Sequence, residues 1–235
     1  MRAIGLWAPP VLRAALSTRF PELHPLPTLQ ELDACSPTLP LLLAGEGIGP
    51  SGWLLAALLR TPHPLRPLAL LETRCTPLSV WIAREIGLNA ILDLTRPSEE
   101  WEEILPRLAR GEMAWRPDQI AQALAFDRAL GWRLRRPSPR DWRRWRDLAA
   151  GLPPKALAAR WGLSPAGVSR SLRRLADRLG APGPEDLLGW GFALGIWVGP
   201  PGAPRLAPPL QAWRLLRAAG DPSAVKNWNT CISKP

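Results

Sequence analysis

The stretch PKALAARWGLSPAGVSRSLRRLADRLG, residues 154–180, decides how the second half of the chain folds. Its first residues have the apolar spacing of a short helix up to Trp161, and Gly162 is suited to end that helix in a left-handed conformation. Ser164 and Pro165 then predict the start of a second helix, because serine is a favourable N-cap and proline fits the first helical position. We therefore expect two helices joined by a tight turn.

The second of these helices has two chemically distinct faces. An apolar stripe recurs with a period of about 3.6 residues and consists of Val168, Leu172, Leu175 and Leu179. The opposite face carries Arg170, Arg173 and Arg174. One interpretation is a solvated charged face. The preceding helix, the glycine turn and the serine–proline start favour the other, a helix that presents its arginines to the DNA major groove.

The charge of the chain supports a polyanionic partner for the second half. The 235 residues have a net charge of +10, but residues 1–120 contain 11 basic and 13 acidic side chains, whereas residues 121–235 contain 19 basic and 7 acidic ones. A chain of this length can form two small domains, each with its own core. The basic half is the one expected to bind nucleic acid.

Several functional classes lack support in the sequence. Cys35, Cys75 and Cys231 are odd in number and irregularly spaced, and only His24 and His63 could join them. We expect neither a zinc site nor a disulfide framework, and a reducing cytoplasm as the location. No apolar run approaches the ~18 residues of a membrane span, so no membrane is expected. There is no clustered acid/base pair, metal set or nucleophile motif, so we expect no enzyme and no cofactor.

The first half alternates apolar strands with helices. Continuous apolar strands in such a pattern indicate an α/β domain with a parallel sheet covered on both faces. The glycine-rich loop Gly45–Gly52 lacks the lysine and Ser/Thr ending of a phosphate loop, so nucleotide binding is not expected there. The expected strands are residues 3–7, 39–44, 68–71 and 90–92, with a further one near 22–26, and the expected helices are residues 11–20, 53–59, 78–86 and a segment that begins at Pro97.

The first half resembles the receiver domains of two-component response regulators over about residues 1–120. The segments that carry the resemblance are Pro10–Leu16, Gly49–Gly52, Ala90–Glu100 and, most clearly, Leu105–Met113, which is similar to the last helix of the NarL/FixJ type and the start of its linker. The resemblance implies a flavodoxin-like parallel sheet.

The positions that carry receiver chemistry are occupied differently here. Trp7 and Ala8 stand where the resemblance places the acidic pair that holds Mg²⁺, and Ala44 replaces the phosphoacceptor aspartate. Glu72 stands at the hydroxyl position and Leu94 at the lysine position. Without these carboxylates the domain has neither a nucleophile nor a hard oxygen site for magnesium. We interpret it as a pseudo-receiver without aspartyl phosphorylation, whose degenerate pocket is a filled core or a small-ligand site.

The chain from Ser138 to about Gly195 resembles the LuxR-type (NarL/FixJ) DNA-binding domain, a four-helix helix-turn-helix unit. The matching residues are Ser138–Arg140, Ala149–Leu152, Lys155, Leu157, Ala158, Gly162–Pro165, Val168, Leu179 and Gly180. Ser169 and Ser171 stand where the family has a lysine and a histidine. The resemblance implies base-reading or phosphate positions at Ser169, Arg170 and Arg173, with Lys155 beside the DNA backbone.

The complete set of expected DNA-binding residues is Lys155, Ser164, Ser169, Arg170, Arg173, Arg174 and Arg178. The resemblance also implies a homodimer on pseudo-palindromic double-stranded DNA. RNA polymerase is a partner under the sigma-like alternative given below. The apolar segment Pro184–Leu194 is either the pairing helix of that dimer or part of the domain core.

The expected organisation is a pseudo-receiver at 1–120, a linker at 121–137, the helix-turn-helix domain at 138–198 and an extension at 199–235. That extension contains a proline-rich spacer and one amphipathic helix at 210–219. The leading hypothesis is a transcription regulator that acts without phosphorylation. The alternatives are a sigma-like or polymerase-associated factor, which the α/β first half disfavours, and a regulator gated by a small molecule in the receiver pocket.

Overall fold

A computed structural model describes residues 4–26, 28, 31, 35–36, 38–44, 52–60, 65–200 and 203–218. The chain divides into two compact units, the first formed by residues 1–123 together with 208–235, and the second by residues 124–207. The glycine-rich loop Gly45–Gly52 lies almost wholly outside the described residues, and the C-terminal tail after Ala218 lies entirely outside them.

The first unit is built on a five-stranded parallel sheet. The strands are β1 (Ile4–Trp7), β2 (Leu23–Pro25), β3 (Leu41–Ala44), β4 (Leu68–Glu72) and β5 (Ala90–Asp93). Their order is β2-β1-β3-β4-β5, and every neighbouring pair is parallel. This is the order of flavodoxin-like folds. The predicted α/β fold is therefore confirmed, and the proline-containing segment near residue 24 does form a strand.

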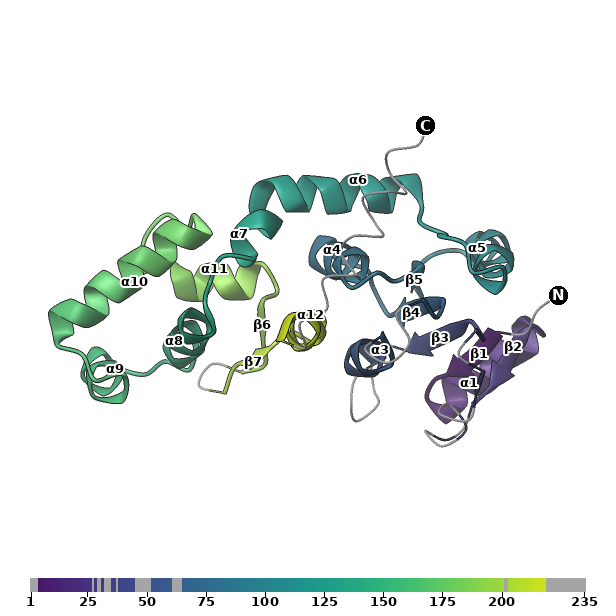
Figure 1. Ribbon diagram of the computed structural model, residues 1–235, viewed down its shortest axis with the longest axis horizontal. Coiled ribbons are helices and arrows are strands. Elements are labelled where there is room, and N and C mark those ends of the chain that lie inside the picture. Colours follow the sequence, from purple (N-terminus) through teal and green to yellow (C-terminus); the bar gives the residue numbers. More distant parts are fainter. Residues whose placement is uncertain are drawn as a thin grey trace. The chain divides into compact units, whose positions relative to one another are not determined.

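Helices cover both faces of this sheet (Figure 1). Alternate strand residues such as Leu42 and Leu92 share one core with α1 (Pro10–Arg19) and α5 (Glu99–Ala109), where Phe20 stacks on Trp101. The other face carries α3 (Gly52–Arg60) and α4 (Pro77–Glu85). Since both faces are covered, all four residues of β1 and all four of β3 are buried.

The helical segment that begins within the last residues of 1–123 and continues into the second unit is longer than one regular element. α6 (Pro117–Phe126) continues into a π-helical turn, η1 (Asp127–Gly131), and then into α7 (Trp132–Leu134). The sequence predicts one linker helix over residues 118–130. The structure extends it to Leu134, with the wider turn in its middle.

The second unit contains four further helices and a short hairpin. The helices are α8 (Pro139–Ala149), α9 (Pro154–Trp161), α10 (Pro165–Leu179) and α11 (Leu187–Ala193). Two-residue strands, β6 (Trp197–Val198) and β7 (Arg205–Leu206), pair antiparallel. The hairpin falls partly within the expected proline-rich spacer.

The last described helix, α12 (Pro208–Ala218), belongs to the first unit. It packs against α3 and α4, with Leu210, Ala212 and Trp213 buried. The indole rings of Trp81 on α4 and Trp213 on α12 have centroids 5.6 Å apart. The chain therefore leaves the first unit, builds the second, and returns to complete the first. No helix among the described residues is long and apolar enough to cross a membrane.

Candidate nucleic-acid interface

Two helices joined by a glycine turn form the centre of the second unit. Gly162 ends α9 with φ of 62° and ψ of 41°, and the Leu163 amide donates to the Ala158 carbonyl oxygen at 3.0 Å. This is the backbone pattern of a Schellman C-cap. The Ser164 side chain then accepts a hydrogen bond from the Gly167 amide at 3.1 Å and caps α10. Local sequence chemistry thus sets both ends of the turn.

The second unit has a tryptophan-rich core, and α10 buries one of its faces. Val168, Leu175 and Leu179 of the predicted stripe are buried, while Leu172 is half-buried. The Trp145 ring on α8 stacks with Trp142 at 5.4 Å between centroids, and its Nε1 donates to the Leu187 carbonyl oxygen at 3.0 Å. α10 packs against α9 and α7, and side-chain bonds from Ser171 and Arg178 join it to α8, so its exposed face is held in a fixed orientation within the second unit.

The exposed face of α10 carries the arginines that the sequence predicts. Arg170, Arg173 and Arg174 are exposed, and none of them forms an ion pair within the described part of the chain. At about 100° per residue, Arg170 lies near the middle of the exposed face, opposite the buried stripe. Arg173 lies on one side of it and Arg174 on the other. Three charged groups on one helix are therefore available to an anionic partner.

The other predicted contact residues are exposed, but some of their side chains already form hydrogen bonds within the protein. Lys155 is exposed near the start of α9. Ser164 is exposed, but its hydroxyl oxygen already serves as the helix cap. Ser169 is exposed on the Arg173 flank, where its Oγ donates to the Pro165 carbonyl oxygen at 3.3 Å.

Arg178, the remaining predicted residue, is ion-paired. Its guanidinium donates to the Asp141 carboxylate, which also accepts hydrogen bonds from the amide and hydroxyl of Ser138 at 2.9 and 2.8 Å. Burial raises the pKa of Asp141, but these Ser138 hydrogen bonds and the nearby Arg178 charge outweigh it, so the pKa lies below its ordinary value. The pair joins the start of α8 to the end of α10.

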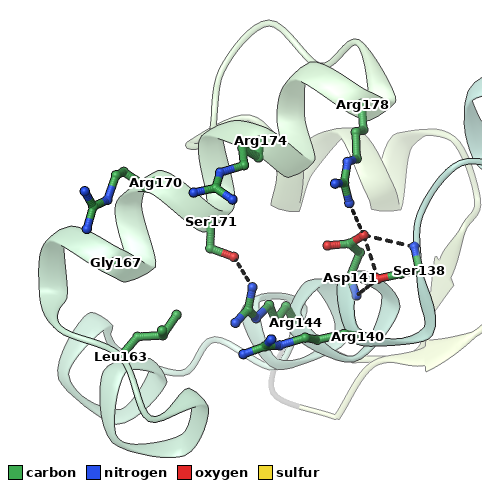
Figure 2. Close-up of a pocket in the computed structure, with 10 residues that line it drawn as sticks. All are labelled: Ser138, Arg140, Asp141, Arg144, Leu163, Gly167, Arg170, Ser171, Arg174 and Arg178. Carbon is green, nitrogen blue, oxygen red and sulfur yellow. Dashed lines mark hydrogen bonds and ion pairs between the residues drawn. The ribbon is translucent and has the colours of Figure 1, made fainter.

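A groove of about 410 Å³ separates α8 from α10 (Figure 2). Its lining is strongly basic and holds a single carboxylate. The residues that line it are Ser138, Arg140, Asp141, Arg144, Leu163, Gly167, Arg170, Ser171, Arg174 and Arg178. One wall of this groove is the Arg174 flank of α10.

Arg144 is the most enclosed of the groove arginines. Its Nη1 donates to Ser171 Oγ at 2.6 Å, and its guanidinium carbon lies 5.2 Å from the centroid of the Trp161 ring. Burial lowers the pKa of this guanidinium, and the charges of Arg140 and Arg174 lower it further, while Asp141 opposes them. Positive charges are thus crowded at this point of the groove.

The sequence did not predict the groove, although it indicated Arg174 and Arg178 of the α10 wall, and Arg143 or Arg144 of α8, as contacts to phosphate. Arg140 and Arg144 lie one helical turn apart on α8. The sequence predicts where this helix starts, because Ser138 and Pro139 form a helix-start pattern. That i, i+4 spacing was the available signal. It shows that the two side chains share a face of α8, but not that this face is turned toward α10.

The residues that the sequence aligns with the chemical positions of receiver domains lie at or near the carboxyl edge of the parallel sheet. Trp7 and Ala44 end β1 and β3, Ala8 follows β1, and all three are buried. The chain order reverses between β1 and β3, and such a switch point is where flavodoxin-like folds place their ligands. Here it is lined by an indole ring and two methyl groups.

The acidic residues at the same edge are engaged with the protein itself. Glu72, the last residue of β4, is buried and accepts a hydrogen bond from Trp53 Nε1. Asp93, opposite it at the end of β5, accepts hydrogen bonds from the amides of Cys75 and Thr95 at 2.9 and 2.8 Å. Leu94 follows and is partly exposed. Among the described residues no group of three or more His, Cys, Asp or Glu side chains could hold a metal ion.

The chain is similar to known proteins in its three-dimensional structure. No model of a protein family matches the chain, and no curated protein matches it. The solved structures that are similar include the two-component response regulator RcsB in complex with DNA, with 15% identity, a TM-score of 0.52, and coverage of 83% of this chain and 98% of that one.

Two structures of RcsB from Salmonella are similar to the same degree. RcsB from Salmonella typhimurium has 15% identity, a TM-score of 0.54 and coverage of 81% and 98%. RcsB from Salmonella enterica serovar Typhimurium, bound to the promoter P1flhDC in the presence of phosphomimetic BeF3−, has 16% identity, a TM-score of 0.54 and coverage of 81% and 97%. The chain therefore has the fold of two-component response regulators, a flavodoxin-like unit followed by a helical one.

Proposed function

We propose that this protein is a DNA-binding transcription regulator that reads double-stranded DNA through the exposed face of α10. The observation that carries the proposal is the set Arg170, Arg173 and Arg174, exposed and without ion pairs in the described structure, on a helix anchored by a buried stripe. Arginine can donate two hydrogen bonds to guanine O6 and N7, which contributes ~1–3 kcal/mol of discrimination between bases.

The charge around this helix supports the same function. From Pro139 to Leu179 the chain carries 10 basic and 3 acidic residues, and two of the acidic ones, Asp141 and Asp147, are ion-paired with arginines of the same unit. The surplus of positive charge favours the DNA backbone in a salt-dependent way. The similarity to RcsB, whose solved structures include DNA complexes, adds a fold that is compatible with this use.

We further propose that the first unit regulates without aspartyl phosphorylation. The buried apolar set Trp7, Ala8 and Ala44 supports this, because it offers neither a nucleophile nor ligands for magnesium at the switch point of the sheet. Leu188, exposed on α11, provides an apolar contact for a homodimer on a pseudo-palindromic site, whereas its neighbour Leu187 is part of the core.

The test is fluorescence anisotropy of the full chain on duplexes selected from a random library, measured across a salt series. We expect sequence-preferring binding with a steep negative dependence on salt. Arg170→Ala or Arg173→Ala is expected to lose ~1–3 kcal/mol of binding free energy and to relax the preference at one base position. Arg74→Ala, which removes an exposed arginine from the first unit, is the matched control and should bind normally.

Adding a phosphodonor or BeF3− with Mg²⁺ to the same assay tests the first unit. The expected result is an unchanged affinity. The side chains of Trp7, Ala8 and Ala44 supply no carboxylate that could accept a phosphoryl group or hold Mg²⁺. Binding that is indifferent both to sequence and to Arg170 and Arg173 would contradict the assignment of α10. A large phosphodonor effect would instead refute phosphorylation-independent action.

A further inference from the structure

The groove between α8 and α10 contains more positive charge than its own ion pairs neutralise. Five arginines line it, and Asp141 is the one carboxylate in its lining. That carboxylate is bound by Arg178 and by Ser138. Arg140, Arg144, Arg170 and Arg174 form no ion pair with any described residue. A surplus of this kind marks the groove as a site for an anion.

Arginines from both helices line the groove. Arg140 and Arg144 lie one turn apart on α8, and Arg170 and Arg174 lie one turn apart on α10. Figure 2 shows the guanidinium groups of Arg140 and Arg144 on the α8 side and that of Arg174 on the α10 side, while Arg170 lies at the outer end of the groove. An anion between the α8 arginines and Arg174 can accept hydrogen bonds from both helices.

Part of this arrangement is held in position without an anion. Arg144 donates to Ser171 Oγ at 2.6 Å and lies against the Trp161 ring, so its side chain is already ordered. Burial and the neighbouring charges of Arg140 and Arg174 disfavour its charged form. A bound anion would relieve that repulsion. Because the Arg144 guanidinium is already ordered, binding would cost little side-chain entropy there.

The chemistry of the lining selects the class of anion. Guanidinium groups donate pairs of parallel hydrogen bonds that match the oxygens of phosphate, and the charges of several arginines suit a phosphate group better than a single carboxylate. The serine hydroxyls of Ser138 and Ser171 add further polar groups to the lining.

We propose that this groove is a binding site for a phosphate group, held by Arg140, Arg144 and Arg174 and adjacent to the base-reading positions Arg170 and Arg173. The phosphate belongs either to the DNA backbone beside α10 or to a free phosphate compound. In the first case the inference rests on the proposed DNA-binding function, and in the second it stands without it.

Two assays on the full chain distinguish these sources. The first is isothermal titration calorimetry with inorganic tripolyphosphate at fixed ionic strength, and the second is the anisotropy assay on the preferred duplex. The variants are Arg140→Gln and Arg174→Gln, singly and together. Both residues are exposed, so the substitutions should leave folding intact. The matched control is Arg143→Gln, an exposed arginine of α8 outside the groove lining.

We expect the double variant to weaken tripolyphosphate binding at least ~10-fold, since two charged hydrogen-bond donors are lost. The control should change it less than ~2-fold. Arg144→Lys, which keeps the charge and removes the paired donors, should weaken it as well.

The pattern of losses identifies the source of the phosphate. If DNA affinity and its salt slope fall in the groove variants beyond the control, the site holds a backbone phosphate. If tripolyphosphate binding alone falls, a free phosphate compound is the ligand. Tripolyphosphate binding that persists without any DNA binding would refute the proposed function and leave the groove assignment standing. The assignment is overturned if groove variants and control behave alike in both assays.

Discussion

Asp141 is one of the residues that join α8 to α10. It completes the capping box of α8 with Ser138 and pairs with Arg178, which is 37 residues away along the chain. The capping half of this role is readable from the local sequence, since serine followed three residues later by an acidic residue is a helix-start signature. The pairing half depends on how two helices pack, and no local pattern encodes it.

The lowered pKa of Asp141 makes a prediction about acid stability. A carboxyl whose pKa is lower in the folded state contributes stability above its ordinary pKa of 3.8, and that contribution is lost as the pH falls through the folded value. Asp141→Asn should therefore lower the urea midpoint at neutral pH, and the difference from the native chain should shrink below about pH 4. Urea titrations at several pH values measure this.

Asp177→Asn is the control for that measurement. Asp177 is exposed on α10 and makes no ion pair with any described residue, so its substitution should leave the midpoint nearly unchanged at every pH. Equal effects of the two substitutions would show that general surface charge, and not the bridge between the helices, sets the acid stability.

At the scale of single elements, two glycines of the second unit, Gly162 and Gly189, differ in their backbone conformation and so in their expected effect on stability. Gly162 ends α9 with a positive φ, a conformation that side chains with a Cβ disfavour, although a Cβ there would meet no atom within 4 Å. Gly189 lies within α11, has no positive φ, and also has open space around it. Backbone conformation alone therefore separates the two positions.

Alanine at these two positions should act in opposite directions. Gly162→Ala is expected to destabilise the second unit by ~1–2 kcal/mol, the cost of a left-handed conformation. Gly189→Ala is expected to stabilise it by ~0.4–1 kcal/mol, because alanine restricts the unfolded chain. Thermal unfolding followed by circular dichroism compares them. A stabilising Gly162→Ala would mean that the turn between α9 and α10 is not the one described.

These elements also show why some structure was predictable from the sequence. The α9–α10 turn is specified by neighbours within a few residues, Gly162 and the Ser164-Pro165 pair, so its position could be predicted closely. The strands of the first unit were legible as short apolar runs because both faces of the sheet are buried. The groove was not predicted, since its two walls come from helices separated by α9 and its turns.

At the scale of the whole molecule, the C-terminal helix α12 completes the first unit. Its amphipathic pattern predicts a helix with one buried face, and the structure contains that helix over Pro208–Ala218. The pattern does not say which surface covers that face. Trp213 and Leu210 are buried, and α12 packs on α3 and α4, so the second unit is joined to the first at both of its ends.

The stability of the first unit should therefore depend on a residue far along the chain from its sheet. Trp213→Ala removes a buried indole that packs against Trp81 on α4, and such truncations destabilise by ~3–5 kcal/mol. Leu215→Ala, on the exposed side of the same helix, is the control and should change stability by less than ~0.5 kcal/mol.

Hydrogen exchange of the α3 and α4 amides locates the effect. Faster exchange in those helices with Trp213→Ala, and not with Leu215→Ala, is the expected result, because loss of the indole uncovers the surface that α12 protects. Unchanged exchange in α3 and α4 would mean that α12 is a passive extension, and that the first unit folds without the end of the chain.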